Sequence, residues 1–264
     1  MVNDRPLKRF GQNYLIDKNI IEKIVKEINP SLHDNIIEVG PGEGALTKYL
    51  SEAVSKLTVV EIDNRKIELL KNKFDNLEII NEDFLDLDLV QFYKNKKIRI
   101  AGNLPYYITS PILFKLIENI NFISDATIMV QYEVAKRMIA EPGSKDYGIL
   151  SVILNYFAVI KFCFKISPNV FYPKPKVYSA LVNLRFNDNL DNNINKKTFV
   201  KIVKACFGNR RKTLKNSLSN SIFSNYDFSS ITDMLHLRAE KLSIKNFIDI
   251  TRLVQNQDAQ IKTK

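Results

Sequence analysis

The sequence has few of the residues on which disulfide frameworks and metal sites depend. Its 264 residues include two cysteines, Cys163 and Cys206, and two histidines, His33 and His236. Both cysteines stand among apolar neighbours, so we expect buried thiols rather than a disulfide framework or a zinc site. Neither histidine has a partner evident in the sequence, and we predict no bound metal.

Long apolar runs and low-complexity segments are also missing. No run is long enough to span a bilayer and no signal peptide is evident, so we expect a cytoplasmic protein without membrane contact. Eight glycines, nine prolines and no biased repeat argue against a fibrous or disordered chain. Hydrophobic residues make up 45% of the chain, enough for one large domain or one medium and one small domain.

Positive charge is concentrated in one segment. The net charge is +10, and the stretch Lys196–Lys215 contains eight basic residues and no acidic one. A basic face of this kind is typical of proteins that bind a polyanion, although a solvated helix face is the simpler alternative. Guanidinium and ammonium groups contact phosphate oxygens without reading base sequence. The candidate phosphate contacts are Arg210, Arg211, Lys212 and Lys215.

Apolar runs at two different periods alternate along the first two thirds of the chain. Strands are expected at 36–39, 57–60, 77–80, 98–101 and 126–130, and helices at 18–28, 45–52, 65–73, 111–118 and 132–139. This alternation predicts an α/β fold with a doubly wound, mostly parallel sheet. Further strands are expected between Val159 and Arg185, where two proline-containing turns separate the apolar runs.

The last third of the chain has a different pattern. The polar run 187–195 is typical of a linker. Beyond it, Phe199, Ile202, Val203, Cys206 and Phe207 are spaced as one face of a helix. No comparable strand signal follows. We therefore predict an α/β domain at 1–189 and a small, all-helical domain at 190–264, with the residues from Gln255 onward frayed.

Polar or glycine-rich motifs follow the expected strands, at the edge where such sheets bind ligands. Gly40 and Gly42 belong to a glycine turn that lets a ligand approach the backbone. Glu61 stands 21 residues after Gly40, where a carboxylate accepts ribose hydroxyls, and Asp83 stands where an adenine amine could be bound. Glu38 and its neighbouring carboxylates would favour a positively charged sulfonium. The alternatives are an ordinary glycine turn and a helix cap at Asp83.

The sequence Asn103-Leu104-Pro105-Tyr106 follows the strand 98–101. We predict that the Asn103 side chain and the Pro105 carbonyl accept the two N–H groups of an exocyclic amine. Tyr106 would stack on the base, and Phe171 is the candidate for a second stacking wall, although either ring could simply be packed. Together with the cofactor motifs, this predicts methyl transfer from S-adenosylmethionine to an amino group of a base that is unstacked from nucleic acid.

The chain resembles the bacterial ribosomal RNA small-subunit adenine-N6 dimethyltransferases, which are related to the rRNA methyltransferases of macrolide resistance and to mitochondrial transcription factor B. The resemblance runs nearly end to end. It is carried by the glycine turn, Val60–Asp63, Asn103–Ser110 and a series of further motifs. These are Phe10–Leu15, Gln131–Ala135, Tyr147–Ser151, Pro173–Ala180, Arg210–Leu214 and Arg238–Glu240.

The resemblance implies dimethylation of two adjacent adenosines near the 3′ end of small-subunit rRNA, within an immature 30S-type particle. It implies a Rossmann-like class I methyltransferase domain at 1–189 and a helical RNA-binding domain at 190–264. It also implies that Asn13 and Leu15 join Gly40, Glu61, Asp83 and Asn103 in binding the cofactor. Departures are small: Tyr14 stands where Phe is usual, and Asn81–Phe84 is more acidic than the common version.

Three alternatives stay open from the sequence. One is a resistance-type enzyme acting on a large-subunit adenosine, and another is a ribosome-assembly or transcription factor in which methylation is incidental. A DNA adenine methyltransferase is the third. A monomer is expected, because no coiled-coil seam or exposed apolar helix is evident.

Overall fold

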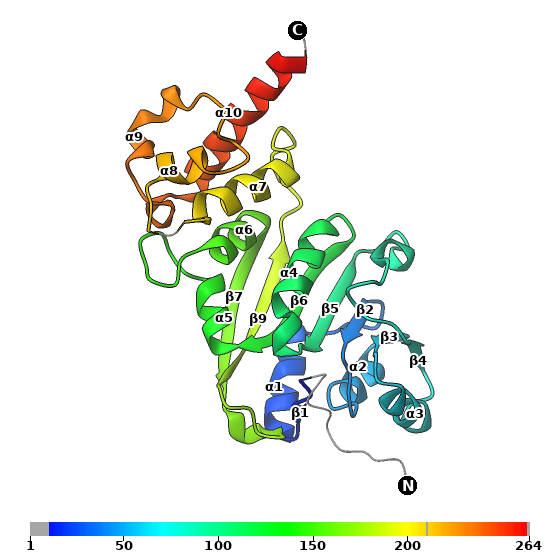
Figure 1. Cartoon of the computed structure of the whole chain (residues 1–264). Helices are drawn as coiled ribbons and strands as arrows, with labels where there is room; N and C mark the ends of the chain where they lie inside the picture. The colour runs from blue at the N-terminus through cyan, green and yellow to red at the C-terminus, as the bar shows by residue number, and fades with distance from the viewer. Residues whose placement is uncertain (1–10, 210, 263–264) are drawn as a thin grey trace. The chain divides into compact units, whose positions relative to one another are not determined.

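The central element of the protein is a seven-stranded sheet with the strand order β4-β3-β2-β5-β6-β9-β7 (Figure 1). The computed structural model describes residues 11–209 and 211–262. The strands are β2 (Asn35–Val39), β3 (Leu57–Val60), β4 (Leu77–Ile80), β5 (Ile98–Asn103), β6 (Ile123–Gln131), β7 (Ala158–Ile166) and β9 (Ser179–Phe186). The five strands from β2 to β6 pair in parallel, and β9 pairs antiparallel to β6.

The strand order reverses between β2 and β5. From β2 the chain continues outward to β3 and β4, and it then returns to add β5 and β6 on the other side of β2. In open α/β sheets, ligands bind beyond the carboxyl ends of the strands at such a switch point. The two strands that flank it end at Val39 and Asn103, so the glycine turn and the Asn103 motif leave the sheet side by side.

Helices connect the strands, and all but the last of the following six lie where the sequence pattern predicts a helix. They are α1 (Lys18–Ile28), α2 (Thr47–Ala53), α3 (Asn64–Lys73), α4 (Thr109–Glu118), α5 (Tyr132–Met138) and α6 (Ile149–Phe157). Asp17 caps α1 by accepting from the Ile20 N–H, and Asp63 caps α3 by accepting from the Arg65 N–H. Asp63 thus begins a helix directly beyond β3, which keeps Glu61 at the end of that strand.

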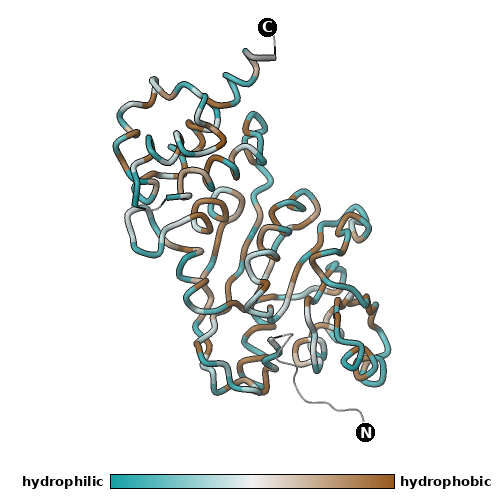
Figure 2. Tube along the Cα trace, in the orientation of Figure 1, coloured by the Kyte–Doolittle hydropathy of each residue, from teal (hydrophilic) through white to brown (hydrophobic). Residues whose placement is uncertain are grey.

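The core lies where apolar strands meet the apolar faces of these helices. All residues of β3 are buried, as are Ile36–Val39 of β2. Figure 2 shows the same distribution, with hydrophobic colour along the strands and hydrophilic colour in many of the connecting loops. Continuous burial of this kind is expected for parallel strands covered on both faces.

A second, two-stranded sheet pairs the N-terminal segment with a distant part of the chain. In this sheet β1 (Tyr14–Leu15) lies antiparallel to β8 (Phe171–Tyr172). Leu15 and Phe171 are partners in the register and both are buried. This pairing fixes the residues just before β1, which contribute to the site described below.

The chain forms two compact units. The first includes the described residues up to Ala135 together with Val159–Phe186, and the second includes Lys136–Ala158 and the residues from Asn187 onward. The helices of the second unit that follow the linker are α7 (Lys196–Phe207), α8 (Leu214–Ser219), α9 (Thr232–Leu235) and α10 (Ile244–Lys262). The predicted boundary between 189 and 190 differs from this division, because α6 packs on α7; the assignment of functions to the two domains stays a prediction.

The structure adds one helix to the second unit and corrects one expectation about it. The sequence analysis assigned α6 to no element, because a short and mostly apolar run does not distinguish a buried helix from a strand. The residues from Gln255 onward continue α10 as far as Lys262 instead of fraying. Within the described part of the chain, none of the helices combines the length and apolar character needed to cross a membrane.

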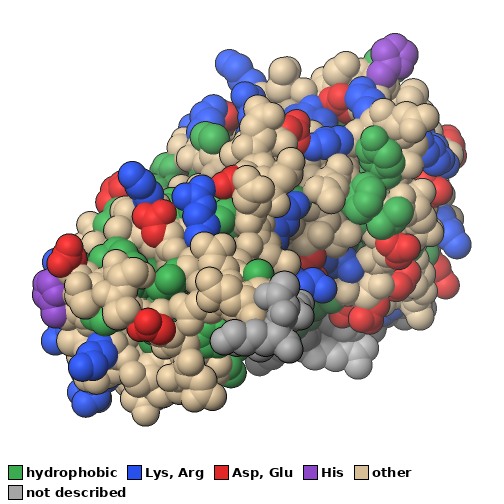
Figure 3. Space-filling model, turned by 90° about the horizontal axis from the view of Figure 1, so that it is seen from above, with side chains coloured by type: hydrophobic (Ala, Val, Ile, Leu, Met, Phe, Trp, Pro, Cys, Tyr) green, Lys and Arg blue, Asp and Glu red, His purple; other side chains and the backbone are tan. Residues whose placement is uncertain are grey.

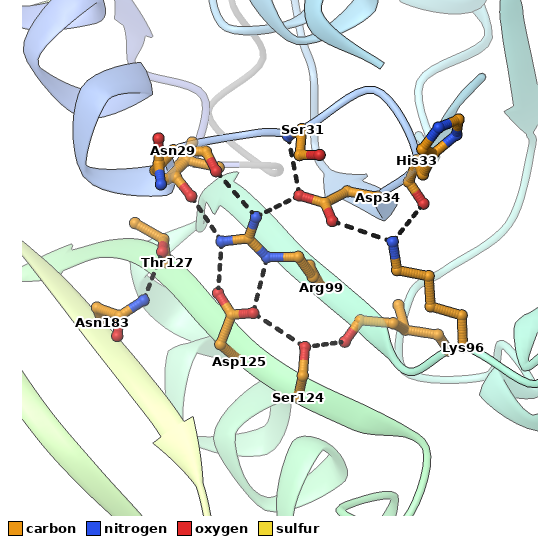
Figure 4. Close-up of polar contacts among 12 residues, drawn as sticks. Asn29, Ser31, His33, Asp34, Lys96, Arg99, Ser124, Asp125, Thr127 and Asn183 are labelled. Atoms are coloured by element: carbon orange, nitrogen blue, oxygen red, sulfur yellow. Dashed lines mark hydrogen bonds and ion pairs between the residues drawn. The ribbon is translucent and has the colours of Figure 1, made fainter. Parts of the chain in front are cut away.

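A polar cluster ties α1 to the sheet at the amino ends of the strands (Figure 4). The Arg99 guanidinium donates to both carboxylate oxygens of Asp125, at 2.8 and 3.1 Å, and also bonds to the Asp34 carboxylate. It further donates to the carbonyl oxygens of Ile28 and Asn29, at the C-terminal end of α1. These bonds raise the pKa of Arg99 against the lowering effect of burial.

Candidate active site

A cavity of about 780 Å³, including its open mouth, lies at the switch point between β2 and β5. Its walls come from the turns after β2, β3, β4 and β5, together with the N-terminal segment. Among the predicted site residues, the cavity is lined by Asn13, Gly40, Gly42, Glu61, Asp83, Asn103, Pro105 and Tyr106.

The glycine turn has a backbone conformation that disfavours other residues. Gly40 and Gly42 have φ angles of +67° and +56°. A Cβ at Gly42 would lie 2.8 Å from the Tyr14 ring, whereas a Cβ at Gly40 would have nothing within 4 Å. Gly42 is therefore needed for packing, and Gly40 leaves open space on the cavity side of the turn.

Glu61 is buried and held by backbone groups. Its Oε2 accepts from the Gly42 N–H at 3.2 Å, and its Oε1 accepts from the Asp63 N–H at 2.9 Å. Burial raises the pKa of Glu61, while these bonds lower it. An ionised carboxylate has about four acceptor positions, so Glu61 can still accept from a hydroxyl group of a ligand in the cavity.

Asp83 both accepts a backbone hydrogen bond, as a cap would, and lines the cavity, as a ligand contact would. Its Oδ1 accepts from the Leu85 N–H at 2.9 Å, which closes the turn after β4, and the residue also lines the cavity. One carboxylate oxygen thus shapes the loop. The other Asp83 oxygen accepts no hydrogen bond from the described residues, so it can accept from an amino group in the cavity.

The Asn103 amide is oriented by the N-terminal segment. Its Nδ2 donates to the Asn13 carbonyl at 2.7 Å, and the Asn13 side chain in turn donates to the Gly11 carbonyl at 3.0 Å. Since the donor end of the Asn103 amide is used in this way, Oδ1 is the end that can accept an amine proton. Asn13 therefore acts in this structure through its backbone carbonyl.

The Pro105 carbonyl is already engaged in the structure. It accepts from the Ile108 N–H at 3.2 Å and from the Thr109 hydroxyl at 3.4 Å, at the start of α4. A carbonyl oxygen has two lone pairs, so this arrangement disfavours the predicted role of Pro105 as an amine acceptor. The neighbouring Leu104 lines the cavity, and its carbonyl accepts no hydrogen bond from the described residues.

Tyr106 is half-buried and held from one end. Its hydroxyl lies 2.6 Å from the Ser179 Oγ at the start of β9, and burial raises its pKa above the ordinary value. The ring lines the cavity on the side of Asn103, where an aromatic surface can contact a flat base. The adjacent Tyr107 is 60% exposed at the cavity mouth.

Two predicted residues lie away from the main cavity. Leu15 is buried in β1 and lines a smaller, adjoining cavity of about 350 Å³ that Gly40 and Asn103 also line. Phe171 is 3% exposed and packs in the core cluster, so in this structure it presents no stacking surface. Its neighbour Tyr172 is 61% exposed.

Glu38 is more deeply buried than its place beside the glycine turn suggested. Its side chain is enclosed, and Oε2 has no hydrogen-bond partner within the described residues. Burial, assisted by the charge of Glu61, raises the pKa of Glu38 to about 8. It is therefore mostly protonated at neutral pH, and the expectation that Glu38 contributes a negative charge to the site is corrected.

Sequence reasoning missed several residues that line the cavity. They are Gly11, Gln12, Tyr14, Phe84 and Tyr107. Gln12 donates to Asp63 at 3.0 Å, and Arg65 together with Gln12 lowers the pKa of Asp63 to about 2. The motif at 10–15 was noticed only through the family resemblance, because nothing in its composition indicates a site.

The basic segment lies in the second unit. Arg211, Lys212 and Lys215 are exposed, whereas Arg210 lies outside the described residues. The Thr213 side chain caps α8, so these cations flank the start of a helix. On the face drawn in Figure 3, Lys and Arg side chains are interspersed with acidic ones, so the charge is not gathered in a single block there.

The chain is similar to known proteins over most of its length. Residues 3–256 match the family described as ribosomal RNA adenine dimethylase. A ribosomal RNA small subunit methyltransferase A from Chlorobium phaeobacteroides is 42% identical over 244 residues, covering 92% of this chain and 91% of the relative. A protein of the same name from Francisella tularensis subsp. novicida is 44% identical over 253 residues, covering 94% and 97%.

Solved structures show the same fold. A dimethyladenosine transferase from Plasmodium falciparum matches with a TM-score of 0.78 at 24% identity, covering 93% of this chain and 97% of that one. The 23S rRNA methyltransferase ErmE matches with a TM-score of 0.66 at 26% identity, covering 90% and 100%.

Proposed function

The chain belongs to the ribosomal RNA adenine dimethylase family, and from this membership we propose how its residues dimethylate N6 of two adjacent adenosines near the 3′ end of 16S rRNA. The enzyme depends on S-adenosylmethionine. The observation that carries the assignment of residues is the switch point, which gathers the glycine turn, Glu61, Asp83 and the Asn103 motif around one cavity.

The residues fit an adenosine-containing sulfonium cofactor, which supplies an electrophilic methyl group when it is bound. Gly40 leaves the space for it, and the Glu61 carboxylate can still accept from a ribose hydroxyl. The free oxygen of Asp83 would accept from an adenine amine. Asn13 and Leu15 are proposed to cover the cofactor from the N-terminal side. The Asn13 carbonyl also fixes the Asn103 side chain.

The adenosine to be methylated binds between Asn103 and Tyr106. Asn103 Oδ1 accepts one N–H of the amine, and the Leu104 carbonyl, rather than the engaged Pro105 carbonyl, accepts the other. These bonds draw the nitrogen toward tetrahedral geometry and aim its lone pair along the transfer direction. No strong base is required, because the proton leaves after the nitrogen has become cationic. Positioning of this kind can contribute up to about 7–11 kcal/mol.

The RNA is held by residues outside this cavity. Arg210, Arg211, Lys212 and Lys215 are proposed to contact rRNA phosphates, and the base reaches the cavity by unstacking from its neighbours. Phe171 would need to leave the core to stack on the base, so Tyr106 is assigned the stacking role. The substrate is proposed to be a partly assembled small subunit, and the enzyme is proposed to act as a monomer.

The test is methyl transfer from labelled S-adenosylmethionine to undermethylated small subunits, naked 16S rRNA, large subunits and DNA, followed by nucleoside analysis. Dimethyladenosine is expected in small subunits, and less in naked rRNA. Asn103→Ala should abolish transfer, whereas Asn189→Ala, an exposed residue of the linker, should not. Label in large subunits would favour a resistance-type activity, and no label with retained subunit binding would favour an assembly role.

A further inference from the structure

A second basic segment, separate in sequence from Lys196–Lys215, lies in the first unit. The 28 residues of Val159–Phe186 contain five basic residues and no acidic one. The segment includes β7, the edge strand of the large sheet, and β9 (Figure 1). Lys165, Lys174 and Lys176 of this segment are exposed. Lys161 of β7 is paired with Glu27 at 2.6 Å, and the remaining cations of the segment give it a positive charge that attracts an anionic ligand.

Exposed aromatic rings lie among these lysines. Tyr178 is 49% exposed, and its ring centroid lies 3.9 Å from the Lys165 ammonium nitrogen. The same nitrogen lies 4.6 Å from the Tyr132 ring centroid, and Tyr132 contacts Phe162 edge-on at 6.1 Å. We call Tyr132, Lys165 and Tyr178 the Tyr178 subsite. An aromatic ring with a cation beside it is the combination with which proteins bind single-stranded nucleic acid.

The backbone of the Tyr178 subsite adjoins that of the active site. Asn103 pairs with Met129 on β6, and two residues further along β6 Gln131 pairs with Ser179. Ser179 is also the residue whose Oγ lies 2.6 Å from the Tyr106 hydroxyl. The next pair of residues beyond this point is joined by a bond from the Tyr132 N–H to the Tyr178 carbonyl, at 2.9 Å. The subsite therefore begins one residue beyond the partner of the proposed stacking ring.

We propose that the Tyr178 subsite binds a nucleotide that flanks the target adenosine in the rRNA strand. The Tyr178 ring stacks on the base of that nucleotide, and Lys165 contacts its phosphate. Held in this way, the flanking nucleotide keeps the strand open beside the unstacked adenosine, which lowers the cost of bringing the target to Tyr106. The inference rests on the proposed rRNA substrate, and it adds a contact that the methyl-transfer cavity does not contain.

The test measures binding of a fluorescein-labelled single-stranded oligoadenylate by fluorescence anisotropy. Loss of one stacked base weakens binding by about 5- to 160-fold, so Tyr178→Ala should raise the Kd by at least about fivefold. Tyr178→Phe keeps the ring and should bind like the parent chain. Tyr93→Ala removes a different tyrosine, 41% exposed and outside the subsite, and serves as the matched control.

Lys165 has its own readout. Lys165→Gln should reduce the slope of log K against log salt concentration by about 0.7, the value for one phosphate contact on a single strand. Tyr178→Phe should leave that slope unchanged. An unaltered slope for Lys165→Gln, an unchanged Kd for Tyr178→Ala, or an equal loss in Tyr93→Ala each contradicts the subsite.

Failure of this subsite differs from failure of the proposed function. If the parent chain methylates small subunits and Tyr178→Ala binds the oligoadenylate normally, these results contradict the subsite but not the activity. If the chain binds the oligoadenylate through Tyr178 but forms no dimethyladenosine, these results contradict the activity but not the subsite. Calorimetric binding of S-adenosylhomocysteine to each variant verifies that the cofactor site and the first unit are folded.

Discussion

Tyr106 is the residue at which substrate contact and cofactor contact can be separated. Its ring faces the cavity, while its hydroxyl only anchors it to Ser179. We expect Tyr106→Ala to lower methyl transfer about 5- to 160-fold, since a stacked base is worth about 1–3 kcal/mol. Affinity for S-adenosylhomocysteine, measured by calorimetry, should stay within about twofold. Tyr106→Phe is the control and should retain most activity; an equal fall in cofactor affinity for Tyr106→Ala would contradict this separation.

Glu38 predicts a pH dependence of stability. The folded carboxyl keeps its proton up to about pH 8, whereas an unfolded one loses it near 4.5. The folded state therefore binds more protons between these values, and the stability that Glu38 contributes falls as pH rises through this window. The free energy of unfolding of Glu38→Gln, taken relative to that of the parent chain, should therefore increase as the pH rises. The increase should be at most about 1.4 kcal/mol per pH unit. Urea unfolding at pH 5, 6.5 and 8 measures this; a constant difference between the two proteins would contradict it.

The polar residues of the site differ in how far the sequence could predict them. Gly40, Glu61 and Asn103 follow apolar strands directly, so the fold rule alone places them at one edge. The engaged carbonyl of Pro105 could not be predicted, because it depends on where the next helix begins. Burial of Phe171 likewise depends on its pairing with Leu15, across more than 150 residues of sequence.

At the scale of elements, the helices and strands with a clear apolar pattern were predicted best. Strands β3 and β4 have the predicted bounds, because short apolar runs end there at polar motifs. Helix α6 was missed, since its nine residues are almost all apolar and such a run does not distinguish a buried helix from a strand. Strand β1 has two residues, too few for any pattern, although it orients the segment that holds Asn103.

The short sheet of β1 and β8 should respond to the cofactor. Two paired residues on each strand are marginal by themselves, so their amides should exchange quickly in the free protein. Ligand contacts at Asn13 and in the adjoining cavity should slow the exchange of Leu15 and Ile16. Hydrogen–deuterium exchange with and without S-adenosylhomocysteine measures the change, with β3 as a control that is protected in both states. Identical exchange at β1 in the two states would contradict a closing role for this segment.

Arg99 joins three elements at the amino ends of the strands, whereas the cavity lies at their carboxyl ends. Its replacement should therefore lower the stability of the protein without changing methyl transfer. Arg99→Lys should lower the free energy of unfolding by about 2 kcal/mol, since an ammonium group cannot reproduce the paired bonds to Asp125 while also reaching Asp34 and α1. Urea unfolding is the measurement. Lys18→Gln, which removes an exposed pair with Glu22, should cost less than about 0.5 kcal/mol. Cofactor affinity of folded Arg99→Lys should be normal.

At the scale of the whole molecule, the charge has a simple distribution. Of the net +10, the segment Lys196–Lys215 carries +8 and the segment Val159–Phe186 carries +5, so the other residues together carry −3. The basic character of the protein thus belongs to two segments, one in each compact unit. The charge pattern of the sequence revealed the first segment. A function for the second is suggested only by the strand register, which places its backbone next to that of the active site.

If the two segments contact one RNA, their electrostatic contributions should add. Replacing Arg211, Lys212 and Lys215 together by Gln should reduce the salt slope for rRNA binding by about 2–3, at roughly 0.7–0.9 per lost phosphate contact. Adding Lys165→Gln should reduce it by a further 0.7 or so, because residues without shared partners act independently. The control replaces three exposed lysines outside both segments, Lys26, Lys71 and Lys94, and should change the slope by much less. A control as damaging as the triple variant would mean that net charge, rather than these segments, attracts the RNA.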